Sequence, residues 1–295
     1  MLQQLLQLVL AGLTVGSGYA LVALGIHIIL RATRVINFAQ GEFVILGGLL
    51  AYTAVSACHL SVLVALPLAT AAGFAIGLLF ERLVIRPAER SGELTATIAT
   101  IGTVYVLLYG HALIWGSLPQ PLPFFSGGDR DVVWHAGGVE IAAQQIWVVG
   151  LLAAALAALW FFFERTTYGK AIRAAADNPL GARLVGIDVD RARAISVAIA
   201  IALAAFGGTI IGPITLVGGA AGVAISIKGF VGAIVGGLDS PIGCTLGGLF
   251  VGVLEQLLEA PFSYGIADPV VYSLLLAMLL VRPQGLLGSR RAVRD

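Results

Sequence analysis

Long, predominantly apolar runs constrain this chain more than any other feature. They include Leu5 to Leu30, Phe43 to Ala57, Leu94 to Trp115, Ile146 to Phe163 and Ile195 to Ile211. These runs approach or reach the roughly 20 residues that carry a helix across the hydrocarbon core of a bilayer. Strands of a membrane barrel would be shorter and would alternate apolar with polar residues. The runs therefore predict an integral membrane protein built from helices.

Composition points the same way. Charged residues make up 11% of the chain and the mean hydropathy is +0.98, whereas about a quarter of the residues in soluble domains are charged. The net charge of +1 does not suggest nucleic acid as a partner. We expect a protein that spends most of its surface in lipid.

Turn and charge signals between the runs divide the chain into membrane spans. We predict spans near 5–30, 41–58, 62–80, 94–115, 146–163, 194–211, 225–238, 243–259 and 266–281. The seventh is short, so the number of crossings is eight or nine. The predicted fold is a single all-α polytopic domain over 1–295, with short or broken helices where glycines cluster.

The basic residues predict the orientation, because cytoplasmic loops carry an excess of Lys and Arg. Alternate connections hold 15 of the 17 basic residues, and the exceptions are Arg130 and Lys228. This places the N-terminus outside, the C-terminus in the cytoplasm, residues 164–193 in a cytoplasmic loop and residues 116–145 in an external loop. If the first run were two segments broken at its glycines, the N-terminus would instead lie inside.

Motifs of catalysis and of cofactor binding are missing from the sequence. It holds no phosphate-binding G-x-x-x-x-G-K-[ST], no H-E-x-x-H, no Cys/His cluster and no G-x-S-x-G. We therefore predict that this chain is not an enzyme, has no catalytic or metal site and binds no cofactor itself.

The cytoplasmic loop carries a distinctive pattern, "ERTTYGKAIRAAADNPLGARLVGIDVDRAR" from Glu164. A helix is predicted over Tyr168 to Ala176, then a cap at Asn178 with Pro179 in the first helical position. A second short helix should run to Val185 and stop at Gly186. Taken on charge alone, the loop could simply be a solvated segment at the membrane interface.

This segment closely resembles the cytoplasmic coupling segment of permease subunits in ATP-binding cassette importers of the branched-chain amino acid family. The resemblance extends to "GLTVGSGYALVALGIHIILRATRVINFAQGEF", "ERLVIRP", "KGFVGAIVGGLDSPIGCTLGGLFVGVLE" and "RPQGLLG". The Asn-Phe-Ala-x-Gly-Glu run is similar to the signature of the H type of permease, one of two related types.

The resemblance implies partners as well as a location. It implies a multi-pass protein of the bacterial inner membrane that pairs with a second, M-type permease. Two cytoplasmic ATPase subunits would hydrolyse ATP, and a periplasmic or extracellular binding protein would deliver the substrate. The expected substrate is a branched-chain amino acid; urea and short amides stay as alternatives. A stand-alone channel or secondary transporter, which would need an ion-coupling site in the membrane, is the alternative from another class.

The resemblance also implies which residues contact the ATPase. Ala171, Ala174, Ala175 and Leu184 would pack against it, and Arg173 and Arg183 would donate salt bridges. The full expected coupling set is Tyr168, Gly169, Ala171, Arg173, Ala174, Ala175, Asn178, Pro179, Arg183, Leu184 and Gly186.

Four polar residues are candidates for the translocation pathway: Asn37, Gln40, Glu42 and Lys228. Asn37 and Gln40 have the spacing of a capping box at the start of the second span. Alternatively, Ile36 to Phe43 is the break in a discontinuous helix, with free backbone amides facing a polar cavity. Lys228 could extend to the outer interface or meet a substrate carboxylate at the outer mouth.

Overall fold

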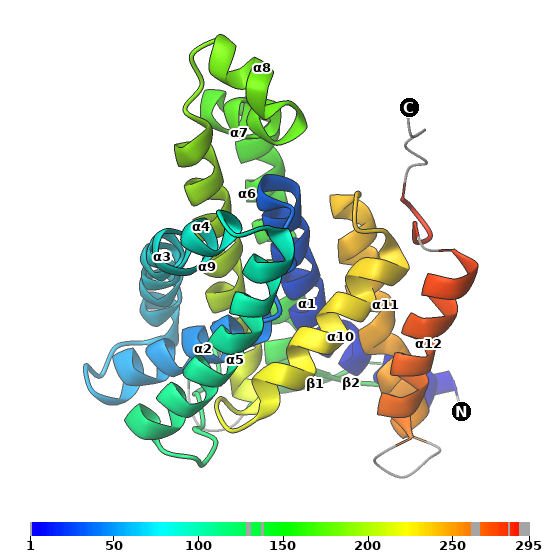
Figure 1. Cartoon of the computed structure of the whole chain (residues 1–295). Helices are drawn as coiled ribbons and strands as arrows, with labels where there is room; N and C mark the ends of the chain where they lie inside the picture. The colour runs from blue at the N-terminus through cyan, green and yellow to red at the C-terminus, as the bar shows by residue number, and fades with distance from the viewer. Residues whose placement is uncertain (1, 128–130, 137–138, 261–265, 283, 289–295) are drawn as a thin grey trace.

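The computed structural model describes residues 2–127, 131–136, 139–260, 266–282 and 284–288, and most of them are helical (Figure 1). All nine predicted segments form helices. They are α1 (Leu2–Thr33), α2 (Gln40–Ser56), α3 (Val62–Phe80), α5 (Glu93–Trp115), α6 (Ala143–Arg165), α9 (Val189–Thr215), α10 (Ala221–Gly236), α11 (Pro241–Glu259) and α12 (Ala267–Val281). The prediction of a polytopic helical protein is confirmed.

The helices differ in length, in agreement with the short and broken spans that the sequence predicts. Within the described residues, six helices are long and apolar enough to cross a membrane. One of these runs from Val62 to Glu89, because α3 continues into further helical turns. Those turns are the π-helix η1 (Glu81–Ile85) and α4 (Arg86–Glu89). Helices α2, α10 and α12 are shorter.

The segment predicted as an external loop contains a β-hairpin. Strands β1 (Val133–Ala136) and β2 (Val139–Ala142) pair antiparallel, with Trp134 opposite Ile141. The prediction of an all-α fold is wrong here. The run "DVVWHAGGVEIA" contains a β-branched or aromatic stretch on each side of a Gly-Gly pair, which is typical of a hairpin.

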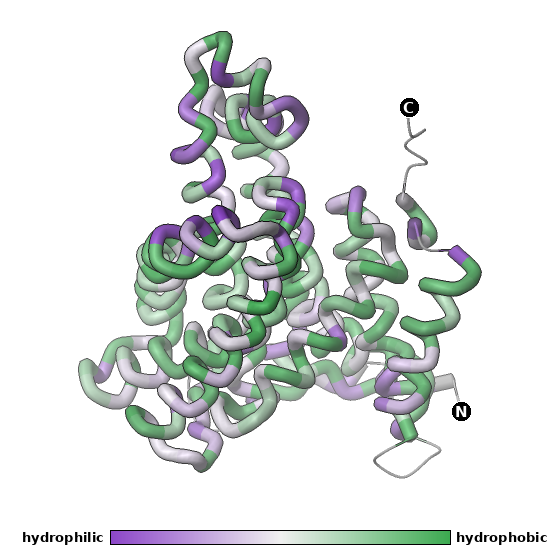
Figure 2. Tube along the Cα trace, in the orientation of Figure 1, coloured by the Kyte–Doolittle hydropathy of each residue, from purple (hydrophilic) through white to green (hydrophobic). Residues whose placement is uncertain are grey.

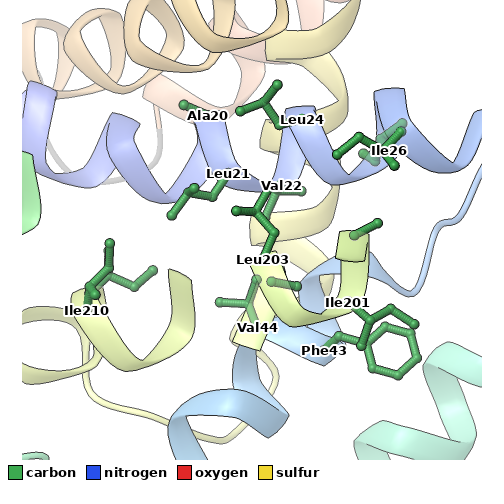
Figure 3. Close-up of a cluster of buried hydrophobic side chains, with 14 of the residues drawn as sticks. Ala20, Leu21, Val22, Leu24, Ile26, Phe43, Val44, Ile201, Leu203 and Ile210 are labelled. Carbon is green, nitrogen blue, oxygen red and sulfur yellow. The ribbon is translucent and has the colours of Figure 1, made fainter. Parts of the chain in front are cut away.

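Helix α1 is the centre of the bundle. It is continuous from Leu2 to Thr33, so the alternative of two segments broken at its glycines is wrong. Every side chain from Tyr19 to Ile29 is buried. Figure 3 shows Leu21 and Val22 of α1 close to Phe43 and Val44 of α2 and to residues of α9, which together form the main core.

Glycines allow α1 and α11 to approach so closely that their backbones are in contact. A Cβ built on Gly252 would lie 2.3 Å from Cα of Gly16, and one on Gly248 would lie 2.4 Å from the amide nitrogen of Ala20. Helix α10 approaches α11 just as closely, since a Cβ built on Gly232 would lie 2.7 Å from Cα of Gly248. Gly248 and Gly252 have the small-xxx-small spacing that lets helix backbones approach closely.

Polar residues gather at one end of the bundle. Figure 2 shows them around the helices α7 (Thr167–Asp177), α8 (Pro179–Leu184) and α4, while the shafts of the bundle are apolar. The β1–β2 hairpin lies toward the opposite end in Figure 1. The two ends of the bundle are therefore chemically distinct.

The close crossing of α1 and α11 predicts that Gly252→Ala will destabilise the bundle. Its Cβ would overlap backbone atoms that cannot rotate away, so the two helices must separate. Exposed Cys58 is replaced by Ser, so that buried Cys244 alone reacts with a thiol-reactive fluorophore on unfolding. Thermal unfolding in detergent, followed by this reaction, should show a transition lower by roughly 5 °C or more.

Gly150→Ala is the matched control for this substitution. Gly150 lies in α6, and a Cβ built on it would have nothing within 4 Å. This change should therefore leave the transition unaltered or raise it slightly. Equal effects of the two substitutions would contradict the assigned crossing.

Candidate functional site

Helices α7 and α8 form a compact pair, hereafter the α7–α8 segment (Thr167–Leu184). The Thr166 hydroxyl accepts a hydrogen bond from the Gly169 amide at 3.0 Å and caps α7. The Asn178 side chain caps α8 by accepting from the Gly181 amide at 2.9 Å, with Pro179 in the first turn. Gly186 then ends the segment with φ 84°. The two short helices predicted from the sequence are confirmed.

One face of this segment packs inward. Gly169 and Ala175 are buried, and Ile172 and Ala175 join a small core with the start of α9. A Cβ on Gly169 would lie 2.1 Å from the carbonyl oxygen of Phe162. The expectation that Ala175 packs against a partner is therefore corrected, because this side chain holds the segment together internally.

The opposite face is apolar and exposed. Leu184 is 82% exposed, Val185 76%, and Tyr168 and Leu180 71% each. Ala174 is also exposed, and Ala171 is partly buried beside it. We define the α7–α8 apolar surface as Tyr168, Ala174, Leu180, Leu184 and Val185. The coupling residues expected from the sequence do not include Leu180 and Val185, although Leu180 and Leu184 have the i, i+4 spacing of one helix face.

Arg173 finds its partner within the chain. It donates hydrogen bonds to both carboxylate oxygens of Glu164, near the end of α6. Arg31, at the end of α1, donates to Asp177 of α7 at 2.7 Å. Ion pairs thus connect the α7–α8 segment with α6 and with the central helix.

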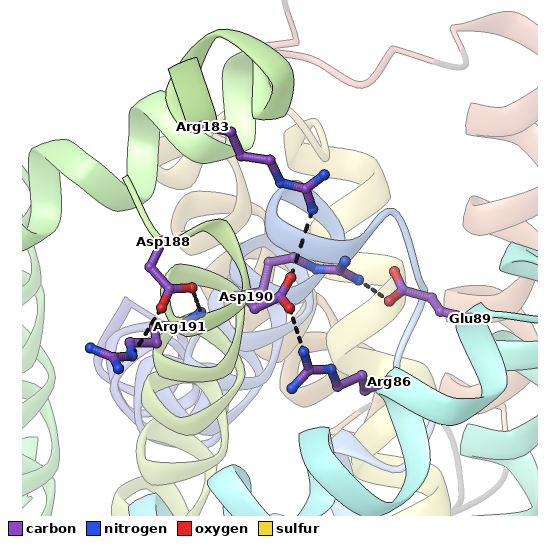
Figure 4. Close-up of polar contacts among 7 residues, drawn as sticks. Arg86, Glu89, Arg183, Asp188, Asp190 and Arg191 are labelled. Atoms are coloured by element: carbon purple, nitrogen blue, oxygen red, sulfur yellow. Dashed lines mark hydrogen bonds and ion pairs between the residues drawn. The ribbon is translucent and has the colours of Figure 1, made fainter. Parts of the chain in front are cut away.

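A second set of ion pairs connects α8 with α9 and α4. Figure 4 shows the Asp190 carboxylate between Arg183 and Arg86, with Arg183 at 3.8 Å. Arg193 of α9 also donates to Glu89 of α4. The sequence predicts a salt bridge from Arg183 to a partner protein, but in this conformation its guanidinium points toward Asp190 of the same chain. Because these groups are partly exposed, each pair contributes little to stability, but together they hold the three elements in register.

Lys228 is the centre of a buried charged cluster. Its ammonium lies 2.6 Å from Oε1 of Glu255 and 2.8 Å from Oδ1 of Asp268. The Tyr19 hydroxyl donates to the other oxygen of Glu255 at 2.8 Å. Lys228 is only 7% exposed, whereas the Asp268 side chain is 49% exposed, so the ammonium is paired within the chain and its extension to the interface stays a prediction. The cluster joins α1, α10, α11 and α12, and a single sequence could not show that these four residues meet.

The polar residues of INFAQGEF are also buried. The amide of Asn37 donates to Oε1 of Gln40 at 2.9 Å, and Gln40 donates to the carbonyl oxygen of Ala200 in α9 at 2.8 Å. The N-cap of α2 is Ala39, which makes no side-chain capping bond. The predicted capping box is therefore wrong, because the Asn37 side chain accepts from the Ala39 amide at 3.1 Å and donates to Gln40, and bonds to no amide of the first turn of α2.

The break between α1 and α2 is real, but its amides have partners. Residues 34–37 have no helical structure and 38–39 form a turn. The Phe38 amide donates to the Thr100 hydroxyl at 3.2 Å, and the Gly41 amide donates to the Ser226 hydroxyl at 3.3 Å. Ser226 in turn donates to the Phe38 carbonyl at 2.6 Å. The prediction that the amides are free and face a cavity is wrong for Phe38 and Gly41, since side chains of α5 and α10 accept their hydrogen bonds.

Glu42 is different from its neighbours. It is 0% exposed, and neither carboxylate oxygen has a hydrogen-bond partner among the described residues. The nearest titratable group is His111 of α5, whose Nδ1 lies 3.6 Å from Oε2, and both ring nitrogens of His111 are equally unpaired. Nowhere in the described ranges do three His, Cys, Asp or Glu side chains gather as a metal site would require.

Comparison with known proteins assigns the chain to a family. Residues 8–282 match the family described as "Branched-chain amino acid transport system / permease component". The chain belongs to this family. The permease resemblance noted in the sequence is confirmed over almost the whole chain.

Individual relatives agree with this assignment. The chain is 34% identical to the high-affinity branched-chain amino acid transport system permease protein LivH of Salmonella typhimurium, across 96% of this chain and 95% of that protein. Identity is 31% to the corresponding protein BraD of Pseudomonas aeruginosa, with the same coverage. It is 30% to a probable LivH of Methanocaldococcus jannaschii, across 91% and 88%.

In this member of the permease family, the buried cluster predicts that Lys228→Met will be strongly destabilising. It would leave Glu255 buried without its counter-charge, which costs about 3–5 kcal/mol in buried ion pairs. The double variant Lys228→Met/Glu255→Gln should recover part of the loss. Thermal unfolding in detergent measures both.

The matched control is Lys170→Met, because Lys170 is exposed on α7. Its unfolding transition should stay within the error of the wild type. An unaltered transition for Lys228→Met would show that the ammonium does not stabilise the four-helix contact.

Proposed function

We propose that this chain is the H-type transmembrane permease subunit of an ATP-binding cassette importer for branched-chain amino acids, in a bacterial inner membrane. The observation that carries the proposal is the match to branched-chain amino acid permeases across 96% of the chain. The chain forms the translocation pathway with a second, M-type permease. ATP is hydrolysed by separate subunits, and an external binding protein delivers the amino acid.

The α7–α8 apolar surface is the docking site for one ATPase subunit. Large apolar side chains such as Leu180, Leu184 and Val185 are unfavourable in water, and burying each in a partner contributes about 1.5–3 kcal/mol. The surface projects from the end of the bundle that carries most polar residues (Figures 1 and 2). It lies in the same segment that the sequence resemblance selects for coupling.

Movement of this surface would reach the bundle by two routes. Helices α6 and α9 flank the α7–α8 segment directly in the chain. The ion pairs Arg31–Asp177 and Arg183–Asp190–Arg86 add connections to α1 and to α4. A push from the ATPase would therefore tilt these helices together, which converts outward access to inward access.

Orientation in the membrane is part of the proposal. With α2, α10 and α12 counted as crossings, nine spans put the α7–α8 segment and the C-terminus in the cytoplasm. The N-terminus and the β1–β2 hairpin are then external. The distribution of 15 of the 17 basic residues supports this orientation.

The proposal predicts that Leu184→Asp will uncouple the transporter. The complete complex in proteoliposomes, with its binding protein outside and ATP inside, should take up leucine, isoleucine and valine. Leu184→Asp should lower leucine uptake by about tenfold or more, since a charge at a central apolar contact disrupts docking. Copurification of the ATPase subunits should fall in parallel.

Leu184→Met is the control at the same position, because it preserves an apolar side chain. It should retain uptake within about twofold of the wild type. Full uptake and full copurification in Leu184→Asp would refute the docking site, whereas a wild-type complex that moves none of the three amino acids would refute the assigned substrate.

A further inference from the structure

The Glu42 carboxylate is buried and has no hydrogen-bond partner among the described residues, which is unusual inside a bundle. A carboxylate can accept about four hydrogen bonds, yet neither oxygen of Glu42 accepts one from the described residues. Buried charges in membrane helices are normally paired or line a functional path. The nearby Asn37 and Gln40 are paired with each other and with α9, so the missing partner is specific to Glu42.

Glu42 lies against the N-termini of two helices. It lies in the first turn of α2, and its carboxylate packs over the first turn of α10, where a Cβ on Gly222 would lie 2.4 Å from Oε1. The N-cap of α10, Ala220, provides no side-chain cap. Both helix ends present positive potential. The fold thus supports a negative charge at this point without bonding to it.

His111 does not serve as the hydrogen-bond partner in this conformation. The separation of 3.6 Å between its Nδ1 and Glu42 exceeds hydrogen-bond distance, and it is too short for a bridging water between the two atoms. Of the α5 residues, only Ala96, Thr100, Val104 and His111 are buried. His111 therefore lies beside the Glu42 carboxylate but donates no hydrogen bond to its oxygens.

A cover lies beside this point, toward the hairpin end of the bundle. Gln120 and Val217 exchange two backbone hydrogen bonds of 2.6 and 2.9 Å, and Val217 contacts α2 at Gly48. The indole of Trp115, next to the His111 ring, donates to Thr53 at 2.7 Å. We call the segments 115–120 and 216–219 the outer cover.

The outer cover is fixed to α2 and packs against its core. The Gln120–Val217 pair joins its two segments, and Trp115 bonds to Thr53 of α2. Val217 is buried beside Ile45 and Leu49 of α2. The second segment ends in Gly218 and Gly219, with φ of 122° and 63°, values that glycine adopts without strain.

We propose that Glu42 is the acceptor for an N–H group of the transported solute. This rests on the proposed import function and adds the solute chemistry to it. The ammonium group of an amino acid supplies three N–H donors and a positive charge that matches the carboxylate. Urea or a short amide would instead donate its amide N–H groups to the same carboxylate.

The test is solute uptake by the complete transporter carrying Glu42→Gln. Labelled leucine and labelled urea are supplied in separate arms with the cognate binding protein, and the thermal unfolding transition of each purified complex is recorded. Glu42→Gln keeps the size of the side chain and removes its charge. We expect uptake to fall by about tenfold or more, because charge-assisted hydrogen bonds are lost, at an unfolding transition close to that of the wild type.

The matched control is Glu93→Gln, since Glu93 is exposed at the start of α5; its uptake should stay within about twofold of the wild type. Loss of leucine uptake identifies the ammonium as the ligand group, and loss of urea uptake identifies the amide. Wild-type uptake in Glu42→Gln would overturn the site. If the wild type moved neither solute, the proposed function would fail and this inference with it.

A measurement on the wild type covers the case in which Glu42→Gln does not fold. Dicyclohexylcarbodiimide modifies carboxyl groups within membranes, and mass spectrometry identifies the modified residue. During ATP turnover without solute, Glu42 should be modified, and the transported solute should lower that modification severalfold. Equal modification with and without solute would overturn the proposal.

Discussion

Close backbone contact between α1 and its neighbours is the constraint on which the rest of the structure depends. Helices in a bilayer gain little from the hydrophobic effect, so they associate through packing and interhelical polar contacts. Gly16 and Gly252 let α1 meet α11, and Gly47 and Gly208 do the same for α2 and α9, where a Cβ on Gly208 would lie 1.8 Å from the Val44 carbonyl oxygen. These contacts leave no space for any other side chain.

The short helix α2 depends on this packing. From Gln40 to Ala51, every residue except Leu46 and Leu50 is buried. The preceding irregular segment lies inside the bundle, where every polar backbone group needs a partner. Side chains of α5 and α10 supply those partners, and the pairing is possible only because the glycines bring α9 and α10 close. Glu42 is the one polar residue of INFAQGEF that this arrangement leaves unpaired among the described residues.

Polar contacts divide the protein into two functional ends. At one end, partly exposed ion pairs around Asp190 and Asp177 connect the α7–α8 segment with α1, α4 and α9. Elsewhere, the buried Lys228–Glu255–Asp268 cluster holds α12 against α10 and α11. The first set is weak and adjustable, whereas the second is costly to break. A coupling movement is therefore easier near the α7–α8 segment than within the Lys228 cluster.

The sequence by itself determined the helices, their approximate ends and the two short helices of the α7–α8 segment. These depend on local physics: apolar length, the Asn178–Pro179 cap and the Gly186 terminus act within a few residues of the chain. It also identified Glu42 and Lys228 as exceptional. Only the tertiary structure decided that Lys228 meets Glu255, that Ala175 faces inward, that Asn37 does not cap α2 and that Glu42 has no partner among the described residues. Each of these outcomes depends on helices far apart in the chain, whose crossings are selected by side-chain and backbone fit that no local pattern encodes.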